Sequence, residues 1–166
     1  MADYGFDGMI WASFIPAVAN VAAPTVTELS AGVELHDVLT ADGLSISADT
    51  ATVDTSKLSS TANSETIGRD SYTVSVTYVR GDHTEATDVA EALVRGASGY
   101  LAVRRNKLAT VAVASADEVE LYPIIWHRPN PATPAANALQ TVEVGASVTD
   151  GNKVRGVDNP ATVAGP

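Results

Sequence analysis

The chain has no cysteine and few aromatic residues, and each shortage excludes something. Without Cys, neither a disulfide nor a thiolate metal site can form. Aromatic residues make up only 5% of the 166 residues, although hydrophobic residues reach 45%. Much of that hydrophobic share is Ala and Val, so we expect a core of small and β-branched side chains. The length fits one domain with a sizeable core.

Long apolar runs are also missing. No run approaches the roughly 20 residues that a helix needs to span a bilayer. The N-terminal sequence MADYGFDGM lacks the basic region that begins a secretory signal. We therefore expect that the protein is made in the cytoplasm and does not associate with a membrane.

Basic residues are absent from the first third of the chain. The net charge is -10, from 20 acidic and 10 basic residues, and no Lys or Arg precedes Lys57. Binding of a phosphate backbone requires cationic contacts, so this part of the chain is a poor nucleic-acid binder. Two interpretations are open: a surface that keeps the protein in solution, or one that must not adhere to a nearby polyanion.

No pattern of catalytic or metal-ligating residues stands out. His83 lies between Asp82 and Glu85, which could bind a divalent cation but are also common where a helix begins. His36 and Asp37 fall on opposite faces of a predicted strand and should not pair. The phosphate-binding, dinucleotide-binding and zinc-protease motifs are all missing. We expect no enzyme activity, no cofactor and no bound metal.

The most periodic segment predicts a strand, a helix and a second strand. Residues 71–80 alternate between an apolar face and a Ser/Thr face, which indicates a strand with one buried face. Residues 85–95 carry the apolar stripe of an amphipathic helix. Residues 99–105 return as a strand. A helix this short is unstable alone, so it must pack on the sheet.

Weaker signals fill in the remainder of the chain. Thr25 and Glu28 have the spacing of a capping box. Pro123 inside a strand predicts that this strand lies at an edge of the sheet. We expect further strands at 8–15, 33–40, 118–126 and 139–151, one or two irregular strands at 44–56, a long exposed loop at 57–70, and irregular structure at 128–138.

The order of these segments is similar to that of one known family. The segments that show this similarity are the apolar segment 8–15, Ala23-Pro24-Thr25 leading into Glu28–Gly32 and an acidic strand, the polar loop, the strand–helix–strand unit, Gly99-Tyr100-Leu101 with Arg104-Arg105, and Glu118–Pro123. Over about residues 8–148 the chain resembles the major tail protein, or tail tube protein, of siphophages, especially those that infect actinobacteria.

The resemblance implies a mainly β fold with one helix: a β-sandwich or rolled β-barrel over residues 1–150, flanked by the helix at about 85–95, with residues 151–166 as a flexible C-terminal arm. It also implies homohexameric rings that stack into the tail tube of a virion and conduct DNA during ejection without binding it specifically. The implied partners are other copies of the chain and the tape measure, tail terminator and baseplate proteins.

The resemblance also assigns roles to individual residues. The expected lumen-lining residues, which should not adhere to DNA, are Glu34, Asp37, Thr73, Ser75 and Thr77. The expected inter-subunit residues are Trp11, Phe14, Lys57, Arg69, Arg104, Arg105 and Arg155. Trp11 is also open to a plain core role, and Arg104 and Arg105 to a place at the end of a strand.

A different class of protein fits the composition as well. An Ig-like binding module of a surface or virion protein, or a capsid-decoration protein, would also be β-rich and acidic, but would act as a monomer or small oligomer.

Overall fold

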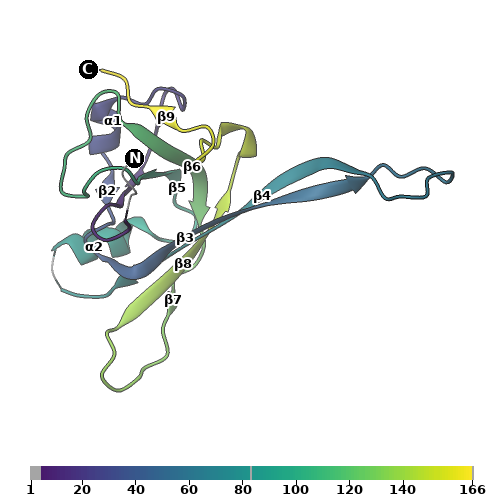
Figure 1. The fold of residues 1–166 in the computed structure, drawn as a ribbon. Coiled ribbons are helices and arrows are strands. Elements are labelled where there is room, and N and C mark those ends of the chain that lie inside the picture. Colours follow the sequence, from purple (N-terminus) through teal and green to yellow (C-terminus); the bar gives the residue numbers. More distant parts are fainter. Residues whose placement is uncertain (1–4, 83, 166) are drawn as a thin grey trace.

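The computed structural model describes residues 5–82 and 84–165, which fold into one antiparallel sheet with short helices packed on it (Figure 1). Residues 1–4, His83 and Pro166, the last residue of the expected C-terminal arm, lie outside the described residues. The strands are β1 (Trp11–Ile15), β2 (Val33–Glu34), β3 (Leu39–Asp54), β4 (Glu65–Val79), β5 (Ser98–Arg104), β6 (Glu118–Trp126), β7 (Asn130–Pro131), β8 (Thr141–Val148) and β9 (Ala161–Thr162). The helices are α1 (Val26–Ser30), α2 (Thr84–Ala92) and the 3-10 helix η1 (Gly151–Lys153).

The sheet rolls over so that its two halves face each other. The strand order is β2-β1-β5-β6-β8-β4-β3, with β7 added to β8 and β9 to β6. Buried side chains of β1, β5 and β6 meet those of β4 and β8 in the main core. Ala86 and Val89 of α2 and Leu93, which directly follows the helix, also pack there. The mainly β, rolled fold with its packed helix is thus confirmed. Among the described residues, no helix is long and apolar enough to cross a membrane.

A second, smaller core covers the other face of β1, β5 and β6. It contains Trp11, Ile15 and Leu29 together with Ala161 and Val163 of the C-terminal segment. Helix α1 supplies Leu29 and begins with the predicted capping box: Thr25 Oγ1 accepts from the Glu28 amide at 3.2 Å, and Glu28 Oε2 accepts from the Thr25 amide at 2.8 Å. Hydrogen bonds from the amides of Thr25 and Ala19 to the Glu28 carboxylate hold its pKa below the ordinary value.

The C-terminal segment packs on this second core instead of extending away as a flexible arm. The Val163 amide donates to the Asp117 carbonyl at 2.8 Å, and the Ala164 amide to the Pro24 carbonyl at 2.8 Å. Arg155 exchanges two backbone hydrogen bonds with Leu121 of β6, at 2.8 and 2.9 Å. Apolar Ala161 and Val163 supply the burial that fixes this segment.

The prediction of one strand over 33–40 is wrong. β2 ends at Glu34, and a turn follows in which the amides of Val38 and Leu39 both donate to the Leu35 carbonyl at 3.0 Å. Leu35 and Val38 are both buried, and their spacing of three residues suits a turn and not an extended strand. The turn carries the chain from β2, at one end of the strand order, to β3 at the other.

β6 is a central strand, although Pro123 predicted an edge. Pro123 pairs with Tyr100 of β5, and its carbonyl accepts from the Thr149 amide at 2.9 Å on the other side. Here the second neighbour of β6 changes from the C-terminal segment at Leu121 to β8 at Ile124. The N–H that Pro123 lacks would therefore lie between the C-terminal segment and β8, where no hydrogen bond of the strand pairing is lost.

Two aromatic residues expected at a subunit interface lie in the cores. Trp11 is 3% exposed and Phe14 8%. The Phe14 ring meets Trp126 edge-on, with ring centroids 5.6 Å apart. The plain core interpretation of Trp11 is the correct one, and the inter-subunit role expected for these two residues is wrong.

Arg104 is also buried, so its expected inter-subunit role is corrected. Its guanidinium donates to Asp117 Oδ2 at 3.0 Å and to the carbonyls of Leu108 at 2.9 Å and Val111 at 2.6 Å. Asp117 also accepts from Lys107 and from the Ala114 amide. Both ends of the loop between β5 and β6 are tied to this buried pair, which explains how a loop with mostly exposed side chains is held.

Substituting Asp117 should therefore be costly and should change the acid response. Burial alone would raise the pKa of Asp117, but hydrogen bonds from Lys107, Ala114 and Arg104 hold it below the ordinary value of 3.8. The stabilisation is thus present above that value and is lost as pH falls through the lower, folded-state pKa.

We expect Asp117→Asn to lower the free energy of unfolding at pH 7 by about 3–5 kcal/mol, because Arg104 loses its buried partner. Urea unfolding at pH 7 and pH 3 measures both effects, and the variant should lose less stability on acidification than the wild type. Asp42→Asn, on an exposed carboxylate, is the control and should stay within about 0.5 kcal/mol. Equal stability of the two variants would contradict the role of the pair.

Candidate assembly surfaces

One face of the β3-β4-β8 half of the sheet is covered by small polar side chains. In β4, Val74, Val76 and Tyr78 point into the core, so the alternate residues Thr73, Ser75 and Thr77 point the other way. Residues directly opposite in antiparallel strands share a face. The register therefore adds Ser45, Ser47 and Asp49 of β3, Ser71 of β4, and Glu143, Gly145 and Ser147 of β8. We call this set the polar face.

The polar face carries hydroxyls and carboxylates but no basic residue. Its charged members are Asp49 and Glu143, and neither Lys nor Arg occurs in residues 45–49, 71–77 or 143–147. His127 borders it: its Nε2 lies 2.7 Å from Ser147 Oγ. Apart from this imidazole, the polar face has no basic group that would hold a phosphate backbone, and its two carboxylates make it negatively charged.

The structure divides the expected lumen residues into two groups. Thr73, Ser75 and Thr77 lie together on the polar face, as predicted. Glu34 and Asp37 do not, because Glu34 pairs with Ser13 in β2 and Asp37 lies in the turn that follows. The β3 and β8 members were not predicted, although the alternation of Ser45, Ser47 and Asp49 is a signal that could have identified those of β3.

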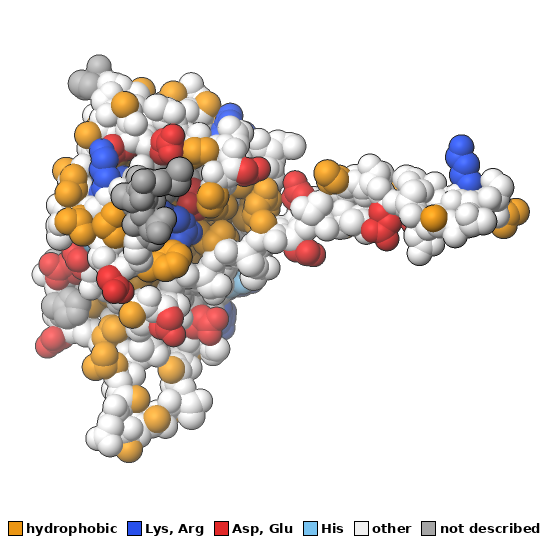
Figure 2. Space-filling model, viewed as in Figure 1, with side chains coloured by type: hydrophobic (Ala, Val, Ile, Leu, Met, Phe, Trp, Pro, Cys, Tyr) orange, Lys and Arg blue, Asp and Glu red, His pale blue; other side chains and the backbone are white. Residues whose placement is uncertain are grey.

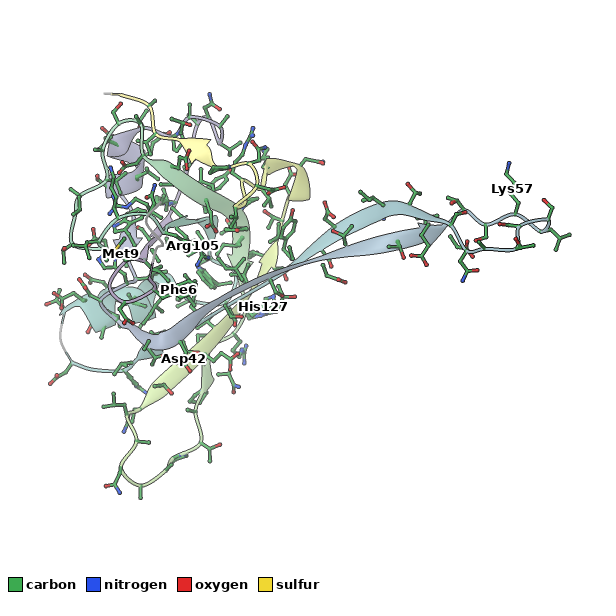
Figure 3. The ribbon with its side chains drawn as sticks, in the orientation of Figure 1. Phe6, Met9, Asp42, Lys57, Arg105 and His127 are labelled. Atoms are coloured by element: carbon green, nitrogen blue, oxygen red, sulfur yellow. The ribbon has the colours of Figure 1, made fainter. Side chains whose placement is uncertain are left out.

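The outer part of β3 and β4 forms a long hairpin that projects from the body (Figure 1). The two strands stay paired from Leu39 and Tyr78 out to Asp54 and Glu65, with an irregularity between Thr50 and Thr52. β3 is thus one continuous strand, and the loop expected at 57–70 is shorter because β4 begins at Glu65. Figure 3 places Lys57 near the tip.

Hydrogen bonds within the hairpin hold its tip in shape. Thr55 Oγ1 donates to Ser64 Oγ at 3.1 Å, and the Thr55 amide to the Ser64 carbonyl at 2.8 Å. Asp54 accepts from the Ser56 amide at 2.8 Å, and hydrogen bonding from Ser56 lowers the pKa of this carboxyl. Side chains of the tip are therefore ordered by one another and not by the body.

The hairpin leaves apolar side chains without cover. Val53 is 50% exposed, Ile67 78%, and Leu58 fully exposed. Figure 2 shows the projection as a narrow, mostly uncharged rod with isolated apolar side chains. A two-stranded hairpin is at best marginally stable in water without a third element. Val53 pairs with Thr66 and Ile67 with Thr52, so the two side chains lie on opposite faces of the hairpin, and each face could be covered by a further chain.

The outer edge of β3 is a second unsatisfied surface. Over the described residues β3 is terminal in the strand order and hydrogen-bonds to β4 alone, along most of its 16 residues. A long unpaired edge is a template for pairing with another chain, and closed assemblies remove such edges.

The four remaining inter-subunit candidates lie in different settings. Lys57 and Arg69 are exposed on the hairpin. Arg105 is partly committed within the chain, since its Nε donates to Glu120 Oε1 at 2.6 Å. Glu120 also accepts from the Tyr122 hydroxyl at 2.9 Å, and burial together with this carboxylate raises the pKa of Tyr122. Arg155 is half-buried in the C-terminal segment.

Comparison with known proteins identifies the family of the chain. No curated protein sequence matches the chain significantly. Among solved structures, the chain is similar to a subunit of the tail of an empty gene transfer agent (GTA) particle refined with C6 symmetry. The TM-score is 0.50 at 15% sequence identity, over 90% of this chain and 96% of that one, which shows a shared fold. A sequence model of a phage tail tube protein family matches residues 1–157, so the chain belongs to the phage tail tube protein family, with a structural role.

Proposed function

We propose that six copies of this chain form a ring, that rings stack into the tail tube of a siphophage virion, and that the polar face lines its lumen. The observation that carries the proposal is the polar face itself: it is hydrophilic over three strands, while the opposite face is buried in β4 and β8 and partly buried in β3. An uncovered sheet face of this kind must meet water, either outside the protein or inside a water-filled tube.

The charge of the polar face suits the passage of DNA. Asp49 and Glu143 repel a polyanion, and the absence of Lys and Arg leaves no site at which phosphates would adhere. DNA would therefore cross the tube without specific binding. Thr73, Ser75 and Thr77 keep their proposed lumen role, while Glu34 and Asp37 are left out of it.

Ring closure would satisfy the β3 edge. Head-to-tail contacts close into a ring when the rotation between copies permits, and the unpaired edge of β3 would then hydrogen-bond to the next copy. The similar GTA tail has C6 symmetry, which supports six copies. Tape measure, tail terminator and baseplate proteins would be further partners. The protein would be made in the bacterial cytoplasm and reside in the virion tail.

The hairpin would supply the contact with another subunit, within a ring or between rings. Covering Val53, Leu58 and Ile67 would remove apolar surface from water, and Lys57 and Arg69 are placed to meet carboxylates of this acidic protein. Arg105 and Arg155 remain proposed for inter-subunit contacts only through the parts that are still exposed.

Reversing charge on the polar face should block DNA passage but leave assembly intact. Asp49→Lys with Glu143→Lys adds positive charge where DNA would pass, so phosphates should adhere to the lumen. In particles built with this double variant, we expect tails of normal length by electron microscopy and at least a tenfold drop in the fraction that releases DNA.

Asp88→Lys with Glu91→Lys, on exposed positions of α2, is the matched control, because it changes the charge by the same amount away from the polar face. This pair should eject DNA normally. Normal ejection by the Asp49/Glu143 variant, or an equal defect in both, would contradict the lumen assignment.

Polar substitution on the hairpin should separate folding from assembly. Val53→Asp with Ile67→Asp changes exposed side chains, so the isolated chain should keep its circular dichroism spectrum and melting temperature. Assembly should fail, since an unpaired carboxylate would have to be buried on whichever face of the hairpin contacts another subunit. Negative-stain microscopy of wild type and variant at equal concentration measures this. Tubes of ordinary dimensions from the variant would overturn the hairpin contact.

A further inference from the structure

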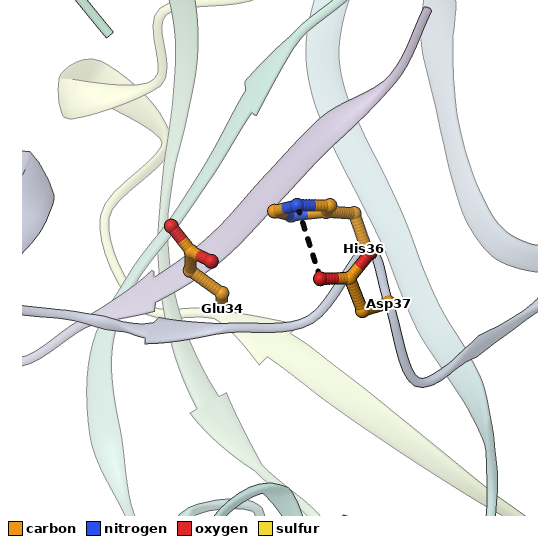
Figure 4. A group of neighbouring side chains, drawn as sticks. All are labelled: Glu34, His36 and Asp37. Carbon is orange, nitrogen blue, oxygen red and sulfur yellow. Dashed lines mark ion pairs between the residues drawn. The ribbon is translucent and has the colours of Figure 1, made fainter. Parts of the chain in front are cut away.

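Three side chains with metal-ligating atoms gather at the turn between β2 and β3, away from the polar face (Figure 4). They are Glu34, His36 and Asp37, and one donor atom from each lies within 4.8 Å of the others. The sequence analysis gave no such site, because it placed His36 and Asp37 on opposite faces of a strand. The turn at residues 35–38 removes that alternation.

Buried backbone contacts fix the position of this turn. Leu35 is fully buried, and its amide donates to the Ala12 carbonyl in β1 at 2.9 Å. The His36 side chain is only 9% exposed, and its ring lies near Trp11, with centroids 6.4 Å apart. Asp37 is 71% exposed, so its carboxylate can rotate. The imidazole is thus a fixed ligand beside two adjustable carboxylates.

The hydrogen bond of His36 decides which ring nitrogen is available. Nδ1 lies 3.4 Å from the Ala12 carbonyl oxygen. A carbonyl can only accept, so Nδ1 must carry the proton of this bond. In a neutral ring Nε2 then has a free lone pair, and it lies 3.7 Å from Asp37 Oδ2.

Nε2 and Asp37 Oδ2 are then two acceptor atoms that face each other, an arrangement in which a cation could bind both. A histidine that donates one N–H to a backbone carbonyl and turns its other nitrogen outward has the arrangement usual for metal ligands.

The donor set favours zinc or a similar divalent transition metal. Zinc binds imidazole nitrogen and carboxylate oxygen at about 2.0–2.2 Å, and three protein ligands with one water complete a tetrahedral site. Mg²⁺ and Ca²⁺ prefer oxygen ligands only, so a histidine does not suit them. We propose that Glu34, His36 and Asp37 form a zinc-class cation site that locks the turn joining the two ends of the sheet.

A neighbouring acidic groove is the main competitor for a bound cation. Glu34 also lines a hollow between β2 and α2 with Glu85, Asp88 and Glu91. These carboxylates raise the local cation concentration, but this groove offers oxygen ligands alone. Zinc binding that depends on His36 therefore separates the proposed site from nonspecific attraction by the groove.

Isothermal titration calorimetry of the full chain, freed of metal by a chelator, tests the proposal with ZnCl₂ and MgCl₂ as probes. We expect one zinc ion to bind per chain and this binding to depend on His36. Magnesium should give no comparable heat of binding. His36→Gln and Asp37→Asn should each weaken binding at least tenfold. Asp37→Asn changes an exposed side chain, so it keeps the test valid if His36→Gln misfolds.

Two control variants separate the site from other zinc ligands. His127→Asn removes a histidine beside the polar face, and Glu91→Gln removes a carboxylate of the groove; neither should change the affinity. NMR should show zinc shifting the His36 Nε2 resonance while Nδ1 keeps its proton. No zinc binding, loss of binding in either control, or a His36 ring protonated on both nitrogens with zinc present would overturn the proposal.

Discussion

Side-chain alternation along β4 is the constraint on which the rest of the structure depends. Val74, Val76 and Tyr78 enter the core that joins the two halves of the rolled sheet. The residues between them are thereby fixed on the opposite face, where Thr73, Ser75 and Thr77 line up with the polar residues of β3 and β8. Packing and the proposed lumen surface are thus two consequences of a single period of two residues.

The subunit carries surfaces that its own chain leaves uncovered. β3 has an unpaired edge, and the hairpin that it shares with β4 extends beyond any supporting element. Such features favour association in a folded protein. The buried Arg104–Asp117 pair, in contrast, shows that part of the scarce positive charge is used inside the subunit, to hold the loop between β5 and β6.

The sequence predicted the segments whose residues repeat with a regular period, and it did not predict those that contacts between distant parts of the chain determine. The strand at 71–80 and the α2 stripe were predictable, because one buried face imposes a clear period. The prediction of one strand over residues 33–40 was wrong, because the buried Leu35 and Val38 lie in a turn. The full length of β3 could not be predicted, since the outer half of this strand pairs with β4 but buries no side chain and so shows no alternation of apolar residues. Arg104 was misassigned, because its partner Asp117 is brought to it only by the fold.

Closure of this chain into a tube with the polar face inside can be tested by cryo-electron microscopy of the assembled wild-type protein. We expect hollow tubes of stacked six-membered rings, with Thr73, Ser75 and Thr77 of every copy facing the lumen. A monodisperse monomer at high concentration, as a binding or decoration module would give, or a tube with this face on its outer wall, would contradict it.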